Sequence, residues 1–121
     1  MHDSSAPLFH SAKFTDPQTV LETIFGYREF RPGQRKIIDA VLAGHDCIGV
    51  MPTGAGKSLT FQVPAKMLNG TVLVLSPLIS LMKDQVDALV PAGLPATFLN
   101  SSLAAWEARE RSVDLEQGVY R

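Results

Sequence analysis

The fold of this 121-residue chain is decided by the stretch Met51-Pro52-Thr53-Gly54-Ala55-Gly56-Lys57-Ser58. Glycines let a backbone turn tightly and bring its N–H groups against phosphate oxygens, because no Cβ atom stands in the way. A helix is predicted to begin near Lys57, and it adds unpaired N–H groups and the positive end of its dipole. We therefore interpret the stretch as a loop that binds the phosphates of a nucleotide. The alternative is a glycine-rich turn without a ligand.

The residue types in this loop have distinct predicted roles. The Lys57 ammonium is expected to reach the β- and γ-phosphates, and the Ser58 hydroxyl to take a place on Mg²⁺, so both are candidate catalytic residues. The general pattern G-x-x-x-x-G-K-[ST] has glycine at the position of Met51, which indicates a variant loop entry. The predicted nucleotide-binding residues of the loop are Thr53, Gly54, Ala55, Gly56, Lys57 and Ser58.

Apolar runs on both sides of the loop indicate strands. Cys47–Met51 and Thr71–Leu75 are short apolar runs and are predicted to be buried strands of a parallel sheet, with Cys47 as a small buried side chain. Ala96–Leu99 could form a third strand. Strands that alternate with helices predict an α/β fold with right-handed crossovers and helices flanking a parallel sheet.

Capping residues and proline set the predicted helix boundaries. Asp16-Pro17 is typical of an N-cap followed by proline in the first turn, and Gly26 could end that helix. Pro64 predicts a kink or an early break. Residues 1–14 are expected to form a mobile tail. The further helices are predicted over Pro32–Ala43, Lys57–Leu68, Leu78–Val90 and Ala104–Gln117, with Asn100 to Ser102 as an N-cap region for the last.

A second candidate site lies upstream of the loop, between Phe25 and Gln34. Tyr27 offers a stacking face, Arg31 a cation, and Gln34 an amide that can both donate and accept, as adenine requires at N7 and N6. On this hypothesis Gln34→Ala weakens adenine nucleotides and leaves inorganic triphosphate unaffected. Considered as residues alone, Tyr27 could equally be a packing residue, with Arg31 and Gln34 facing solvent.

The chain resembles the RecQ-type DNA helicases of superfamily 2 from about Phe25 to its C-terminus. The segment Phe25–Gln34 is similar to their adenine-recognition motif. Met51–Leu59 is similar to their motif I, in which Met51 is normal and the position of Ala55 more often holds glycine. Ser76–Val86 resembles motif Ia, and Leu99–Ser102 fits the segment that follows it.

The resemblance implies part of a RecA-like P-loop NTPase lobe, in an ATP-dependent DNA helicase with 3′–5′ unwinding. It implies contact of Tyr27, Arg31 and Gln34 with the adenine of ATP. It also places Ser76, Pro77 and Leu78 on the path of single-stranded DNA, although without the resemblance these residues form an ordinary turn that opens a helix.

Composition excludes several classes of protein. The chain is 45% hydrophobic and 19% charged, as globular domains are, and its formal net charge is -1, so it lacks the overall basic character of many nucleic-acid-binding domains. A single cysteine forbids an internal disulfide and favours a reducing compartment. No signal peptide or membrane-length apolar run is present, and we expect a cytoplasmic protein without a membrane partner.

Some parts of a helicase motor are not found in this sequence. No Asp-Glu pair follows Ser58, so the acidic motif that holds Mg²⁺ is missing. We expect residues 15–121 to be the N-terminal part of a helicase ATP-binding lobe, with neither unwinding nor appreciable ATP hydrolysis by itself. The alternatives are a stand-alone nucleotide-binding protein that does not hydrolyse ATP, and another P-loop ATPase or kinase, in which Phe25–Gln34 would have no role.

Overall fold

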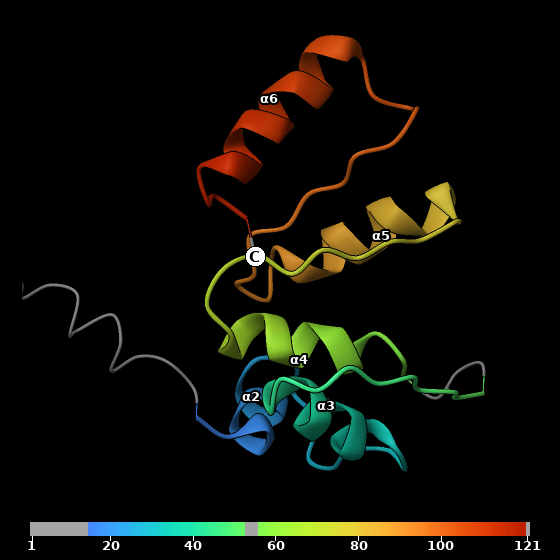
Figure 1. Cartoon of the computed structure of the whole chain (residues 1–121), viewed down its shortest axis with the longest axis vertical. Helices are drawn as coiled ribbons and strands as arrows, with labels where there is room; N and C mark the ends of the chain where they lie inside the picture. The colour runs from blue at the N-terminus through green and yellow to red at the C-terminus, as the bar shows by residue number, and fades with distance from the viewer. Residues whose placement is uncertain (1–14, 53–55, 121) are drawn as a thin grey trace, which may run out of the picture. The chain divides into compact units, whose positions relative to one another are not determined.

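The computed structural model describes residues 15–52 and 56–120, and Figure 1 shows the helices that they form. The chain divides into two compact units, one ending at Met67 and the other beginning at Leu68. In chain order the described helices are α2 (Pro17–Thr23), α3 (Gln34–Leu42), α4 (Leu59–Met67), α5 (Ile79–Leu89) and α6 (Ala105–Glu116).

Helix α2 begins as the sequence predicts. The Asp16 carboxylate accepts a hydrogen bond from the backbone N–H of Gln18 at 3.2 Å, and Pro17 occupies the first turn. Such a cap satisfies one of the N–H groups that a helix start leaves unpaired. The helix ends at Thr23, and Gly26 follows it with a φ of 76°, a left-handed conformation that glycine adopts without a steric penalty.

Three helices of the first unit share one core. Helix α4 packs against both α2 and α3, and each of the three contributes a fully buried aliphatic side chain, namely Val20, Val63 and Ile38. Burial of one such side chain contributes about 1.5–3 kcal/mol. The core therefore joins the helix that follows the phosphate loop to the helices on either side of residues 25–34, which we call the adenine segment after their predicted role.

Helix α4 starts two residues later than the predicted Lys57, and Lys57 and Ser58 form the turn that leads into it. The backbone N–H of Thr60 donates to the Lys57 carbonyl at 3.0 Å. The prediction of an early break at Pro64 is wrong, since the helix continues to Met67. Pro64 is fully buried, so tertiary packing outweighs the backbone hydrogen bond that proline removes.

The second unit contains α5 and α6. Helix α6 fixes the segment before it, because the Arg111 guanidinium donates to the Phe98 carbonyl at 2.9 Å and lies 4.7 Å from the Phe98 ring centroid. The predicted N-cap at Asn100 to Ser102 is wrong, as the helix begins after Ala104. Asn100 instead accepts from the backbone N–H of Ser102 at 2.9 Å, in a local turn.

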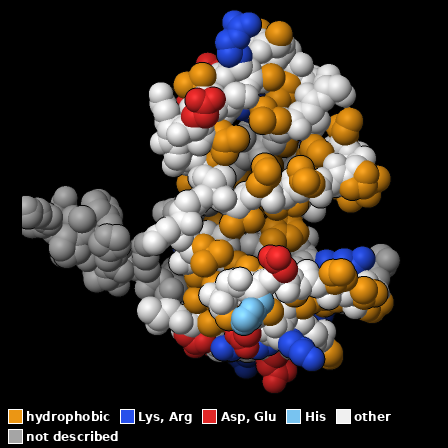
Figure 2. Space-filling view, in the orientation of Figure 1, with side chains coloured by type: hydrophobic (Ala, Val, Ile, Leu, Met, Phe, Trp, Pro, Cys, Tyr) orange, Lys and Arg blue, Asp and Glu red, His pale blue; other side chains and the backbone are white. Residues whose placement is uncertain are grey.

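The predicted parallel sheet is not confirmed in the described part of the chain. Residues 47–51, 71–75 and 96–99 have no regular secondary structure there. The predicted burial of the first two segments is also wrong, because Ile48 is 93% exposed, Leu75 is 88% exposed, and Cys47 is exposed. Figure 2 shows many apolar side chains at the surface. A strand needs a neighbouring strand for its backbone groups, and neither segment pairs with one within residues 15–52 and 56–120.

Candidate nucleotide site

In the described part of the phosphate loop, Gly56 adopts a left-handed backbone conformation that favours glycine. Gly56 has a φ of 76°, and its carbonyl accepts from the backbone N–H of Leu59 at 3.3 Å. Lys57 is exposed, and Ser58 is half-buried at the turn that opens α4. The predictions for Thr53, Gly54 and Ala55 lie outside the described residues. The geometry leaves the Lys57 ammonium accessible to an anionic ligand.

Gln34 connects the adenine segment to the phosphate loop. Its side-chain Nε2 donates to the Gly56 carbonyl at 2.8 Å, and its Oε1 accepts from the backbone N–H of Arg31 at 2.8 Å. The side chain is buried, with only 1% of its surface exposed. The sequence placed these residues in one site, and the structure brings Arg31, Gln34 and Gly56 together.

This burial changes the expected role of Gln34. Its amide was predicted to present a donor and an acceptor to adenine, yet both ends bind backbone groups. Only 1% of the side chain is exposed, so direct contact with a base edge would require the residues that cover it to move. The type of a polar residue in a candidate ligand motif does not show whether it binds a ligand or the chain's own backbone, so adenine contact by Gln34 stays a prediction.

Tyr27 and Arg31 are both accessible. Tyr27 is 55% exposed, and its backbone N–H donates to the Leu21 carbonyl of α2 at 3.1 Å. Arg31 is also exposed, and its backbone N–H donates to the side-chain Oε1 of Gln34. The segment therefore has a fixed backbone and presents an aromatic face and a cation to solvent.

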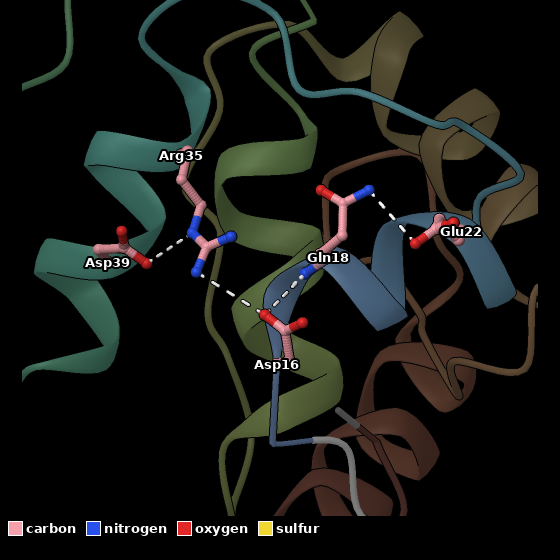
Figure 3. A network of polar contacts seen from close by, with 5 residues as sticks. All are labelled: Asp16, Gln18, Glu22, Arg35 and Asp39. Carbon is pink, nitrogen blue, oxygen red and sulfur yellow. Dashed lines mark hydrogen bonds and ion pairs between the residues drawn. The ribbon is translucent and has the colours of Figure 1, made fainter.

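A polar network missed by the sequence predictions lies beside this segment (Figure 3). The Arg35 guanidinium is 2.9 Å from the Asp39 carboxylate and 3.7 Å from Asp16, and it also lies 5.9 Å from the Phe30 ring centroid. Gln18 donates to Glu22 at 3.3 Å. Helical i, i+4 spacing could have indicated the Arg35–Asp39 and Gln18–Glu22 pairs, but not the link between α2 and α3.

The predicted DNA-contacting residues lie at the start of α5, in the second unit. The Ser76 hydroxyl accepts from the backbone N–H of Leu78 at 3.2 Å, and Pro77 and Leu78 are exposed. Helix α5 has no side-chain cap at Leu78. The first-turn N–H groups after Leu78 thus lack a capping side chain.

Lys83 is exposed on α5, and it pairs with Asp87 at 2.6 Å. The hydrogen bond that Lys83 donates to Asp87, followed by the negative charge of Asp87, raises the pKa of Lys83 above its ordinary value of 10.5. The two residues are one helical turn apart on the protein surface, where ion pairs contribute little to the free energy of unfolding.

The described part of the chain contains neither a carboxylate, histidine or cysteine cluster for a metal nor a membrane-spanning helix. Within residues 15–52 and 56–120 no group of three or more His, Cys, Asp or Glu side chains is placed to hold a metal ion. No helix in the same ranges has the length and apolar character needed to cross a membrane.

The comparison with protein families first defines the class. Residues 31–115 match the model of the DEAD/DEAH box helicases, so the chain belongs to this helicase family. The match begins within the adenine segment and extends into α6, and membership implies a RecA-like P-loop lobe.

The comparison with curated proteins then narrows the type. The chain is 49% identical over 102 residues to the ATP-dependent DNA helicase RecQ of Pasteurella multocida, with 84% of this chain and 16% of the relative covered. For the RecQ of Haemophilus influenzae the identity is 57% over 84 residues, covering 69% and 14%. For that of Bacillus subtilis it is 49% over 105 residues, covering 86% and 18%. The predicted resemblance to RecQ-type helicases is confirmed, and the chain spans less than a fifth of the length of these relatives.

Proposed function

We propose that this chain forms the ATP-binding part of an ATP-dependent DNA helicase of the RecQ type. The hydrogen bond between Gln34 and Gly56 carries the proposal, because it couples the segment that is to bind adenine to the loop that is to bind phosphate. Three curated relatives, each named an ATP-dependent DNA helicase, support the same function. We propose 3′–5′ unwinding and a cytoplasmic location for the whole protein.

In the proposed complex, Tyr27 stacks on adenine and Arg31 lies beside it. The phosphates rest on Thr53, Gly54, Ala55 and Gly56, and Lys57 neutralises their charge. Exposure of Tyr27 and Lys57 supports these roles, since a ligand can reach both without rearrangement. Gln34 acts through Gly56 and Arg31, whose backbone groups its amide binds.

Mg²⁺ would be held by the Ser58 hydroxyl together with phosphate oxygens, and it would neutralise charge that develops on the transferred phosphoryl group. A site of this kind fits the described residues, because Ser58 lies in the same turn as Lys57 and close protein carboxylate groups are not required when the nucleotide supplies ligands.

The phosphate assignment is tested by Lys57→Ala. A charge-assisted hydrogen bond contributes about 1.5–3 kcal/mol, so ATP and inorganic tripolyphosphate should both bind at least about tenfold more weakly. Isothermal titration calorimetry on the chain measures both ligands. Lys36→Ala, which removes an exposed lysine from α3, is the control and should leave both affinities unchanged. Retained affinity in Lys57→Ala contradicts the assignment.

We further propose that Ser76, Pro77 and Leu78 lead single-stranded DNA to the first turn of α5, where backbone N–H groups bind a phosphate. Ser80→Glu tests this, because a carboxylate in the first turn stabilises a helix but repels phosphate. Binding of a fluorescent oligonucleotide should weaken while helicity is kept. Ala88→Glu adds the same charge in the last turn and is the control; equal binding by both variants refutes the DNA contact.

A further inference from the structure

Gln18, on α2, lies outside every motif of the proposed site, yet its side chain reaches the adenine segment. Its Nε2 donates to the backbone carbonyl of Arg28 at 2.6 Å, across ten positions of sequence. The same nitrogen donates to Glu22 at 3.3 Å. Because an amide nitrogen has two hydrogens, both contacts can be made together.

The Arg28 bond is one of two that confine the backbone around Tyr27. On one side, the Tyr27 N–H donates to the Leu21 carbonyl at 3.1 Å. On the other side, Gln18 holds the carbonyl of the next residue, Arg28. Both tethers start from α2, whose Leu21 is fully buried in the first unit.

Tyr27 depends on these tethers because the residue is 55% exposed and is not fixed by burial. A fixed backbone sets the direction of the Cα–Cβ bond and so limits the positions that the ring can reach through its χ1 rotamers. A ring restricted in this way loses less entropy when a base binds. Helix α2 is itself connected to α3, since the Asp16 carboxylate both caps α2 and pairs with Arg35 of α3, as Figure 3 shows.

We propose that Gln18 is a positioning residue, which holds the Arg28 carbonyl so that the Tyr27 ring forms a preformed stacking surface for the nucleotide base. This role rests on the proposed contact between Tyr27 and adenine. It assigns to α2 a share in nucleotide selection, through a residue that does not touch the ligand.

The test compares two substitutions of similar length in the full chain. Gln18→Met removes the donor without adding charge, and Gln18→Lys keeps a donor that can reach the Arg28 carbonyl. Loss of a typical hydrogen bond corresponds to about fivefold in an equilibrium constant. In Gln18→Met, ATP should bind about fivefold more weakly while tripolyphosphate changes less than about twofold, and Gln18→Lys should restore ATP binding.

Glu22→Ala is the matched control, because it removes the second partner of the Gln18 amide and leaves the Arg28 carbonyl untouched. It should bind ATP like the wild type. A purely structural role of Gln18 predicts a lower melting temperature with equal losses for ATP and tripolyphosphate, and this result overturns the positioning role. An unchanged ratio of the two affinities in Gln18→Met overturns it as well.

The wild-type chain separates this inference from the proposed function. Equal affinity of the wild type for ATP and tripolyphosphate would refute adenine contact itself, and positioning with it. A wild-type preference for ATP that Gln18→Met retains would refute positioning alone.

Discussion

The side-chain Nε2 of Gln34 donates a 2.8 Å hydrogen bond to the backbone carbonyl of Gly56, 22 positions further along the chain. The bond joins the first residue of α3 to the glycine that precedes Lys57. Because of this bond, a substitution at either residue is expected to affect both the proposed base-binding segment and the proposed phosphate loop.

Gln34→Ala should therefore weaken ATP and tripolyphosphate together, in contrast to the adenine-selective loss expected from the sequence. The substitution leaves the Gly56 carbonyl and the Arg31 N–H without their partner, which costs about 1–3 kcal/mol for each group that stays buried. Calorimetric titration and thermal unfolding measure the two effects. Gln62→Ala, at another buried glutamine of the first unit, is the control and should reduce stability without a selective effect on either ligand. If Gln34→Ala weakens ATP but leaves tripolyphosphate unaffected, the result supports the original hypothesis that Gln34 contacts adenine directly.

Gly56→Ala should destabilise the loop and abolish tight nucleotide binding. The φ of 76° is strained for alanine by about 1–2 kcal/mol. In addition, the new Cβ would lie 2.5 Å from Gln34 Nε2, so the amide must move. Gly44→Ala shares the strain, with a φ of 83°, but its Cβ meets no atom within 4 Å. A melting temperature and ATP affinity equal to those of Gly44→Ala would show that the contact with Gln34 is unimportant.

Tyr27→Ala should reduce ATP affinity by about 1–3 kcal/mol, the usual contribution of stacking between a base and an aromatic ring. Tripolyphosphate, which has no base, should bind as before. Since Tyr27 is 55% exposed, the fold should tolerate the change. Tyr27→Phe keeps the ring and should retain ATP affinity; an equal loss in both variants would point to the hydroxyl rather than to stacking.

The Lys83–Asp87 pair should contribute to stability only while Lys83 is charged. The pKa of Lys83 is raised by its hydrogen bond to Asp87, so its contribution is complete below the ordinary pKa of 10.5 and is lost as pH rises through the higher value in the folded state. The difference in melting temperature between wild type and Lys83→Met should be small at neutral pH and vanish at higher pH. A difference that grows with pH would contradict the assignment of the shift to Asp87.

Helix positions were predictable where a local signal dominates. Asp16 and Pro17 define the start of α2, because a cap and a first-turn proline act within one turn of the chain. Pro64 shows the limit of such signals, since its buried position in the shared core keeps α4 intact beyond it. Ile48 and Leu75 show a second limit, as apolar character predicts burial only where a partner surface is present.

By itself, the sequence determined the phosphate-loop pattern from Met51 to Ser58 and the family, because both follow from residue types at fixed spacing. Only the tertiary structure decided what Gln34 and Gln18 contact. An amide can serve a ligand or a backbone carbonyl equally well, and the choice depends on which groups the packing of α2, α3 and α4 brings within about 3 Å of it.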